Sequence, residues 1–177
     1  RGIGRVVPYS FQEHLVVGEC LRNRSLDWWR TSSAPFDWTV VAGTAAKVTA
    51  AANIYERGAS LSIAGTGSAG SVSQVIPLEK ILEGVTLTFT AWVKGGGVDN
   101  AALIRLTVGT TDNDSPDTGA STAWQQLTAT AAISNRYRPI TATLVNTNAA
   151  LSYFDACRLY VPINHRVPWL PYSDFIK

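Results

Sequence analysis

A run of strict alternation constrains the fold of this chain more than any other feature. In residues 85–93, VTLTFTAWV, the apolar side chains of Leu87, Phe89 and Ala91 alternate with three threonines and Trp92. Successive side chains of a β-strand point to opposite faces of a sheet, so this period of two places the apolar set in a core and the other set on a polar face. The run therefore predicts a central strand of a sheet that is buried on one side.

The remainder of the chain has the residue mix of β structure. Thr, Val, Ala, Gly and Ser dominate it, and no long stretch repeats its apolar residues with a period of 3.6. Short alternating runs are separated by Gly, Asn, Asp and Pro, which is typical of an all-β sandwich or barrel. Residues 77–83, PLEKILE, are either one helical turn or a loop. Further strands are expected at 38–41, 47–51, 60–64, 71–77, 102–108, 125–131, 139–145 and 151–161.

The two ends differ from this middle. Residues 1–18 mix Val-Val pairs with a proline and aromatic residues, and residues 162–177 carry three prolines among Trp169 and Tyr172. Proline blocks both helix and central strand, so each end is expected to be an extended arm. The aromatic side chains of the arms need a surface, which is either this domain or a neighbouring chain. Residues 19–161 then form one domain, and 177 residues are enough for a substantial hydrophobic core.

Charge and hydropathy exclude two kinds of partner. Only 16% of the residues are charged, the formal net charge is +2, and no Lys/Arg stripe forms, so a nucleic-acid partner is not expected. No apolar run approaches the ~20 residues that span a bilayer, so membrane insertion is not expected either.

The carboxylates, serines and histidines do not predict an enzyme. Asp and Glu are scattered, and no pair stands out as the two facing carboxylates that a glycosidase needs. The chain has no GxSxG motif, and His14 and His165 both lie in the predicted arms, which disfavours Ser-His-Asp chemistry. The Gly-rich segment 65–70, GTGSAG, is followed by a strand pattern and predicts a hairpin loop. Residues 111–119, TDNDSPDTG, miss the EF-hand pattern and predict a solvated loop.

Six short segments stand along the chain in a recognisable order: CLRNRSLD at 20–27, FDWTVVAGTA at 36–45, YERGASLSI at 55–63, SVSQVIPL at 71–78 with VTLTFTAWVK at 85–94, WQQLTAT at 124–130 and YFDACRLY at 153–160. This order is similar to that of one family, the jelly-roll carbohydrate-binding modules appended to glycoside hydrolases. Residues 20–161 resemble this family, which implies a jelly-roll β-sandwich of two antiparallel sheets between the terminal arms. Two positions depart from the family pattern: Asp27 stands where Glu is usual, and Ala156 stands where a second Asp of the last strand is usual.

Trp92 is the main candidate for contact with a sugar. It projects from the polar face of its strand beside Thr88 and Thr90, and sugar rings stack on aromatic faces that have polar neighbours. Trp124 has the same parity as Gln126, so both are expected to line the same face. The alternative is that the two tryptophans pack under loops or termini.

The resemblance also implies where the first and last strands meet. It places Asp27 and Asp155 near each other there, where many of these modules hold a structural calcium ion through carboxylate and carbonyl oxygens. The alternative is that both aspartates cap turns. Cys20 and Cys157 fall on the same two strands, so they form either a disulfide, which implies an oxidising compartment, or two small buried thiols.

Two functions follow from these observations. The first is a non-catalytic module, extracellular or on a virion surface, that binds a glycan such as a host-surface polysaccharide. The alternative is a structural module of a larger assembly, such as a phage capsid decoration, tail or fibre protein, whose arms contact neighbouring subunits. The aromatic, Pro-rich ends favour the alternative, and the two functions are compatible in a virion surface module.

Overall fold

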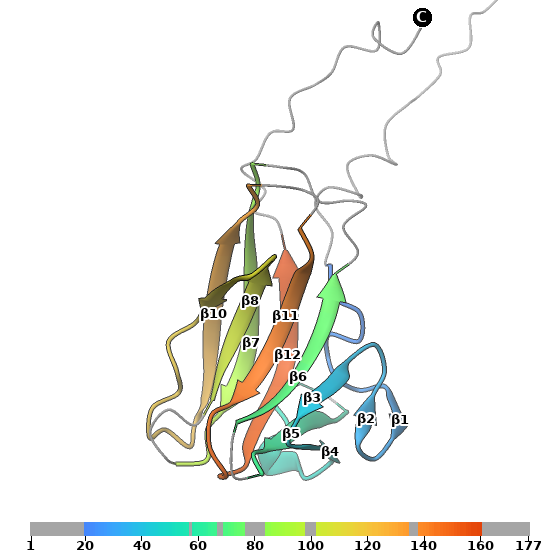
Figure 1. The fold of residues 1–177 in the computed structure, drawn as a ribbon. Coiled ribbons are helices and arrows are strands. Elements are labelled where there is room, and N and C mark those ends of the chain that lie inside the picture. Colours follow the sequence, from blue (N-terminus) through green and yellow to red (C-terminus); the bar gives the residue numbers. More distant parts are fainter. Residues whose placement is uncertain are drawn as a thin grey trace, which may run out of the picture.

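The computed structural model describes residues 20–56, 58–66, 69–76, 84–97, 102–134 and 138–160. The predicted arms at 1–18 and 162–177 and the predicted turn at 77–83 lie outside these residues. Within the described residues the chain forms two five-stranded antiparallel sheets and a separate two-stranded ribbon (Figure 1). This architecture confirms the predicted β-sandwich of two antiparallel sheets.

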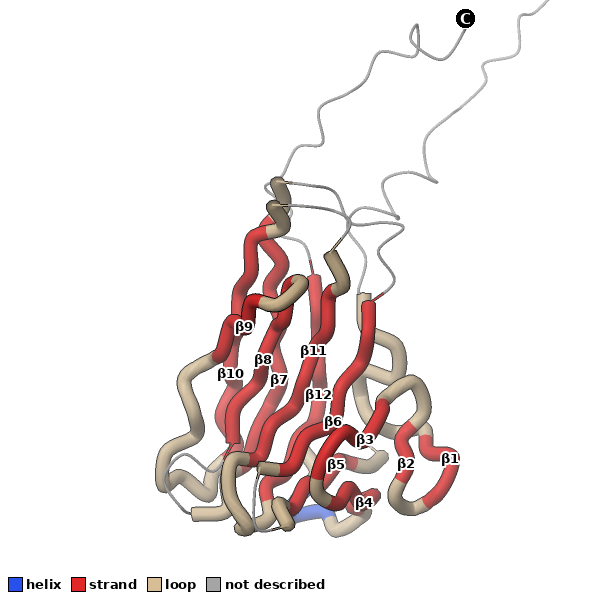
Figure 2. Tube along the Cα trace, in the orientation of Figure 1, coloured by secondary structure: helices blue, strands red, loops and turns tan. Residues whose placement is uncertain are grey.

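The two large sheets are named after one strand each. The β7 sheet has the strand order β10-β7-β12-β5-β4, and the β11 sheet has the order β3-β6-β11-β8-β9. Figure 2 shows the long strands of both sheets running along the sandwich, with a single 3-10 turn, η1, at one end near β4. The elements are β1 (Trp29–Thr31), β2 (Ala34–Pro35), β3 (Thr39–Ala42), β4 (Thr44–Val48), η1 (Ala51–Asn53), β5 (Ser60–Ala64), β6 (Gly70–Ile76), β7 (Thr86–Lys94), β8 (Ala102–Val108), β9 (Thr111–Asp114), β10 (Trp124–Ala132), β11 (Ile140–Asn146) and β12 (Ser152–Tyr160).

The core lies between the two sheets, and β7 is at its centre. Leu87, Phe89, Ala91 and Val93 are fully buried, as the alternation of the sequence predicts. Burial of each large apolar side chain of this kind stabilises the fold by roughly 1.5–3 kcal/mol relative to exposure. The β11 sheet contributes Val72, Ile104, Leu106, Ile140 and Leu144 to the same apolar cluster.

Most predicted strands are present, with shifted ends. β5 and β8 have the predicted bounds, whereas the strand predicted at 47–51 is β4, which begins at Thr44 and ends at Val48. The chain leaves the sheet after β4 because it enters the η1 turn at Ala51. The short ribbon of β1 and β2 was not predicted, since strands of three and two residues carry no period.

The prediction of a solvated loop at residues 111–119 is wrong for the first four of these residues. Thr111–Asp114 form β9, which pairs antiparallel with β8. Arg105 on β8 lies between two carboxylates of β9, at 3.0 Å from Asp112 and 2.6 Å from Asp114. Opposite charges on neighbouring strands stabilise such a pair, and here they allow an acidic strand at the edge of the sheet.

The start of the described chain runs beside the last strand. The N–H of Cys20 donates to the carbonyl of Leu159 (2.9 Å), and the N–H of Cys157 donates to the carbonyl of Arg24 (2.8 Å). Next to the Cys157 contact, between Asp155 and Arg158, β12 carries a bulge in which Ala156 has a left-handed backbone (φ 49°). The bulge shifts the register of β12 against β7 and so determines which side chains of β12 reach the outer face of the β7 sheet.

Candidate binding face

The five predicted sugar-contact residues lie on one surface, the outer face of the β7 sheet. Residues directly opposite each other in an antiparallel pair point to the same side of the sheet. The aligned pairs are Trp92 with Gln126, Thr90 with Thr128, Thr88 with Thr130 and Lys94 with Trp124. On the other side of β7 the same rows continue into Tyr153, Asp155, Arg158 and Tyr160 of β12. The shared face is therefore observed, while a binding role for these residues stays a prediction.

Tyr55, which the sequence analysis did not single out, covers Trp92. The two rings are stacked with their centroids 3.9 Å apart and their planes 13° from parallel. The ring of Tyr55 also meets Trp124 edge-on, with centroids 5.8 Å apart and planes at 61°. Both tryptophans are half-buried, whereas Tyr55 is 42% exposed. One face of Trp92 is thus occupied, and Tyr55 is the most exposed of the three rings.

A buried carboxylate holds the loop that carries Tyr55. Oδ2 of Asp155 accepts hydrogen bonds from the N–H groups of Tyr55 (2.8 Å) and Glu56 (3.0 Å), and Oδ1 accepts one from Ala156 (2.7 Å). Desolvation raises the pKa of Asp155 above its ordinary value, and these three hydrogen bonds oppose the rise. Asp155 is therefore an anchor for the loop and is fully buried, so it presents no surface to a ligand.

Two cations fasten the same loop to the sheet. Nζ of Lys94 donates to the carbonyl of Ala52 (3.0 Å) and to Oδ1 of Asn53 (2.9 Å). Nη2 of Arg158 lies 3.2 Å from Oε1 of Glu56. Since β7 and β12 supply these cations, residues 52–56 form a cover over one end of the outer face.

Asp27 holds the far end of this segment. Its Oδ1 accepts a hydrogen bond from the N–H of Ala59 (2.8 Å). Gly58 next to it has a φ of +99°, and a Cβ added there would come within 2.0 Å of Oδ1 of Asp27. Asp27 and Asp155 are therefore both tied to the stretch between Tyr55 and Ala59, one at each end. This arrangement matches the turn-capping alternative for the two aspartates.

The donor set at these aspartates does not fit calcium. A calcium ion takes six to eight oxygen ligands, but both oxygens of Asp155 and one of Asp27 already accept backbone N–H groups. Within the described part of the chain, no three Asp, Glu, His or Cys residues cluster closely enough to hold a metal ion. Calcium binding by this pair stays a prediction that the geometry does not support.

The remaining predicted residues differ in their access to solvent. Gln126 is exposed and Thr88 is half-buried, so both are available to a ligand. Thr90 is only 5% exposed, which leaves its hydroxyl no open surface. Cys157 is buried and Cys20 is half-buried against the same core, and a disulfide between them stays a prediction.

Comparisons with known proteins identify the fold. The sequence matches no protein-family model and no curated protein. Its structure is similar to the family 61 carbohydrate-binding module TmCBM61 in complex with β-1,4-galactotriose, with a TM-score of 0.54 and 15% identity over 81% of this chain and 99% of that one. It is also similar to the CBM22-1 xylan-binding domain of Paenibacillus barcinonensis Xyn10C, with a TM-score of 0.55 and 16% identity over 82% and 96% of the two chains.

A third similar structure comes from a virus. The enzymatically active domain of tailspike protein 4 of bacteriophage CBA120 matches 81% of this chain with a TM-score of 0.62 and 9% identity. This chain spans only 21% of that tailspike chain. Among the described residues, no helix is long and apolar enough to cross a membrane.

The three structural similarities show that the chain has the jelly-roll β-sandwich fold of carbohydrate-binding modules, which it shares with part of a phage tailspike.

Proposed function

We propose that this domain is a non-catalytic glycan-binding module and that its binding surface is the outer face of the β7 sheet. The observation that carries the proposal is the Tyr55–Trp92 stack, which holds an aromatic ring 42% exposed above a polar sheet. The aromatic face of such a ring packs against the C–H face of a sugar, and the polar groups beside it hydrogen-bond the hydroxyls. The names of two structural neighbours, a galactotriose complex and a xylan-binding domain, support a sugar ligand.

The groups beside Tyr55 suit sugar hydroxyls. Gln126 is exposed and carries both an amide donor and a carbonyl acceptor. Thr128 and Thr130 extend the same polar row along β10. On the other side of β7, Arg158 of β12 forms an ion pair with Glu56, the residue that follows Tyr55. A neutral oligosaccharide lying across β10, β7 and β12 would use all three elements.

The carboxylates of this face support binding rather than catalysis. Asp155 is buried and accepts three backbone hydrogen bonds, while Glu56 is paired with Arg158. A glycosidase needs one carboxylic acid and one carboxylate on opposite sides of an accessible bond. Neither Asp155 nor Glu56 is free for that role. We assign the module to an extracellular or virion surface, where it meets a polysaccharide such as that of a host.

A second candidate function is a structural part of a viral assembly. The similarity to a segment of a phage tailspike favours it. In that case the arms at 1–18 and 162–177 would contact neighbouring subunits, and the jelly roll would serve as a rigid body between them.

Replacement of Tyr55 tests the glycan proposal, and Val75, an exposed apolar residue of the other sheet, supplies a control. The first ligands to titrate by calorimetry are β-1,4-galactotriose and xylan oligomers, followed by a glycan array. We expect Tyr55→Ala to weaken binding about tenfold, which corresponds to about 1.4 kcal/mol, because the ring that contacts the sugar is lost. Val75 of β6 is 67% exposed in the β11 sheet, away from the proposed surface, and Val75→Ala should bind like the parent chain. Equal losses in both variants, or no glycan bound by an oligomeric chain, would contradict the proposal.

A further inference from the structure

A hollow with two exposed aromatic rings lies in the segment between Leu21 and Asp37. It has a volume of about 650 Å³, within the range of sites that take small ligands. Trp28 on its rim is 71% exposed and Phe36 is 40% exposed. Tryptophan is usually well buried, so a ring this open marks a surface that meets something other than water. None of the residues that line this hollow belongs to the Tyr55 face.

Backbone strain is concentrated in this segment. Four non-glycine residues of the described chain have a left-handed backbone, and three of them are Asn23 (φ 47°), Leu26 (φ 56°) and Asp37 (φ 62°). The fourth, Ala156, precedes the N–H of Cys157 that binds the carbonyl of Arg24. Each such residue costs on the order of 1 kcal/mol or more and persists only where its surroundings fix it. Strain of this kind is typical of functional sites.

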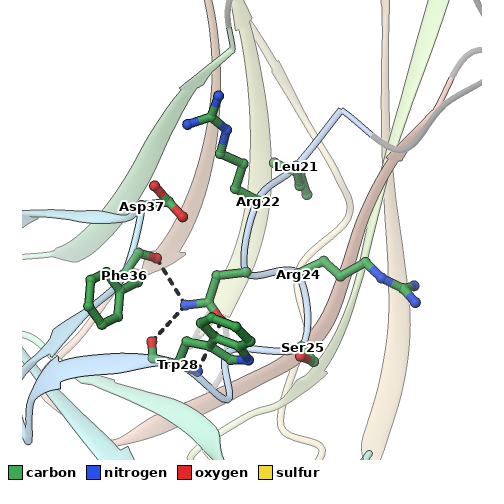
Figure 3. Close-up of a pocket in the computed structure, with 8 residues that line it drawn as sticks. Leu21, Arg22, Arg24, Ser25, Trp28, Phe36 and Asp37 are labelled. Atoms are coloured by element: carbon green, nitrogen blue, oxygen red, sulfur yellow. Dashed lines mark hydrogen bonds between the residues drawn. The ribbon is translucent and has the colours of Figure 1, made fainter. Parts of the chain in front are cut away.

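Hydrogen bonds within the segment fix the backbone at the two residues that carry the exposed rings. The side-chain amide of Asn23 donates to the carbonyls of Trp28 (2.8 Å) and Phe36 (2.9 Å), and its oxygen accepts from the N–H of Trp28 (3.1 Å). These contacts are drawn as dashed lines in Figure 3. Gln74 of β6 adds hydrogen bonds to the carbonyls of Arg22 and Asp37. Because both hydrogens of the Asn23 amide are used, Asn23 fixes the backbone that carries Trp28 and Phe36 and is not itself a ligand-binding group.

Positive charge surrounds the rings. Arg22 and Arg24 line the hollow, and Cζ of Arg30 lies 5.2 Å from the centroid of the Phe36 ring. None of these three arginines forms an ion pair within the part of the chain that the structure describes, unlike Arg105 and Arg158. The single carboxylate that lines the hollow is Asp37. In Figure 3 the side chains of Arg22 and Arg24 leave the segment in two different directions, away from Trp28.

We propose that this hollow is a second binding site and that it takes an acidic oligosaccharide, one with carboxylates on successive sugar residues. The face of Trp28 packs against the C–H face of one sugar. The guanidinium groups of Arg22 and Arg24, which point in different directions, bind the carboxylates of other sugars of the same oligosaccharide through paired N–H···O hydrogen bonds. Asp37 accepts hydrogen bonds from sugar hydroxyls. This site does not depend on the glycan proposed for the Tyr55 face.

The test compares an acidic ligand with its neutral form. The full chain is titrated with a galacturonic acid hexamer and with the fully methyl-esterified hexamer. The acid should bind, its affinity should fall with added salt, and the ester should bind at least about tenfold more weakly because it lacks the charges. Equal binding of acid and ester would overturn the proposal, and so would no binding of the acid. If a poly-glutamate peptide binds as tightly as the hexamer, the site recognises charge and not the sugar rings, and the proposal is also overturned.

Variants assign the binding to this hollow. Trp28→Ala and Arg24→Gln should each weaken binding of the acid at least about tenfold. Trp28 is largely exposed, so circular dichroism and the Tm should change little in its variant, and Arg24→Gln provides an independent test. Arg138→Gln removes an exposed arginine elsewhere and should bind like the parent chain. The Tyr55→Ala variant should also bind the acidic hexamer as tightly as the parent chain does. If Tyr55→Ala no longer binds the acidic hexamer and Trp28→Ala still does, the acidic ligand binds the outer face of the β7 sheet instead. That result would overturn this inference, whatever the outcome for neutral glycans.

Discussion

Asp155 is the single residue on which the cover over the outer face most depends. Its carboxylate is fully buried, yet no cation pairs with it in the described structure. Desolvation raises its pKa, the N–H groups of Glu56, Tyr55 and Ala156 lower it, and the charge of Glu56 raises it again. The net direction is upward, so the folded chain keeps this proton to a higher pH than the unfolded chain does.

This pKa shift gives stability a pH dependence with a defined sign. Between the ordinary pKa of Asp155 and its raised value in the fold, the folded state binds more protons than the unfolded state, so the free energy of unfolding falls as pH rises. Asp155→Asn has no proton to lose at this position. We therefore expect the parent chain to lose stability relative to Asp155→Asn as pH rises from the ordinary pKa of this carboxyl to its raised value in the fold, measured by urea unfolding at a series of pH values. A difference that is constant or grows in favour of the parent would contradict the raised pKa.

Single residues also show where sequence patterns stop being informative. The alternation of residues 85–93 predicts the outward direction of Trp92 correctly, because one face of β7 is buried. Nothing local indicates that Tyr55 covers Trp92, since Tyr55 is placed by Asp155, 100 residues further along the chain. Trp28 and Trp29 are adjacent and have opposite environments. Trp29 packs against the core and donates to the carbonyl of Leu26, while Trp28 stays exposed.

At the scale of elements, strands with a buried face are the predictable part of this fold. β5, β7 and β8 lie inside their sheets and carry a period of two, so their bounds follow closely from the sequence. β9 was missed because its acidic side chains are typical of a loop, and they are accommodated by Arg105 on the neighbouring strand. The loop of residues 52–56 was missed because its order comes from long-range hydrogen bonds rather than from its own composition.

Gly58 tests how tightly the covering segment is fixed. A Cβ at this position would come within 2.0 Å of Oδ1 of Asp27, and the φ of +99° already disfavours any side chain. Gly84 has a similar φ of +83°, but a Cβ there meets no atom of the described chain within 4 Å. We expect Gly84→Ala to cost on the order of 1 kcal/mol of unfolding free energy and Gly58→Ala at least about 1 kcal/mol more, because only the latter breaks the bond between Asp27 and Ala59. Equal losses in thermal or urea unfolding would show that the Asp27 contact contributes nothing.

On the scale of the whole molecule, the bulge of β12 supports both proposed surfaces. Asp155 holds the loop of Tyr55, and two residues later the N–H of Cys157 holds the carbonyl of Arg24 in the segment of Trp28. Ala156 between them adopts the left-handed backbone that lets β12 serve both loops. The two surfaces are therefore built on one irregularity of a strand whose other contacts are regular, which explains how a rigid sandwich presents two different aromatic sites.

The described core and both aromatic surfaces lie within residues 20–160, which predicts what happens when the ends are removed. A chain trimmed to residues 19–161 should fold and should bind the ligand of the Tyr55 face within about twofold of the full chain, because none of the described contacts of that face lies outside this range. Light scattering and calorimetry on both chains give the measurement. A full chain that is oligomeric, loses its oligomers on trimming and binds no glycan in either form would instead assign the function to the arms. A trimmed chain that is folded but no longer binds would show that an arm completes the site.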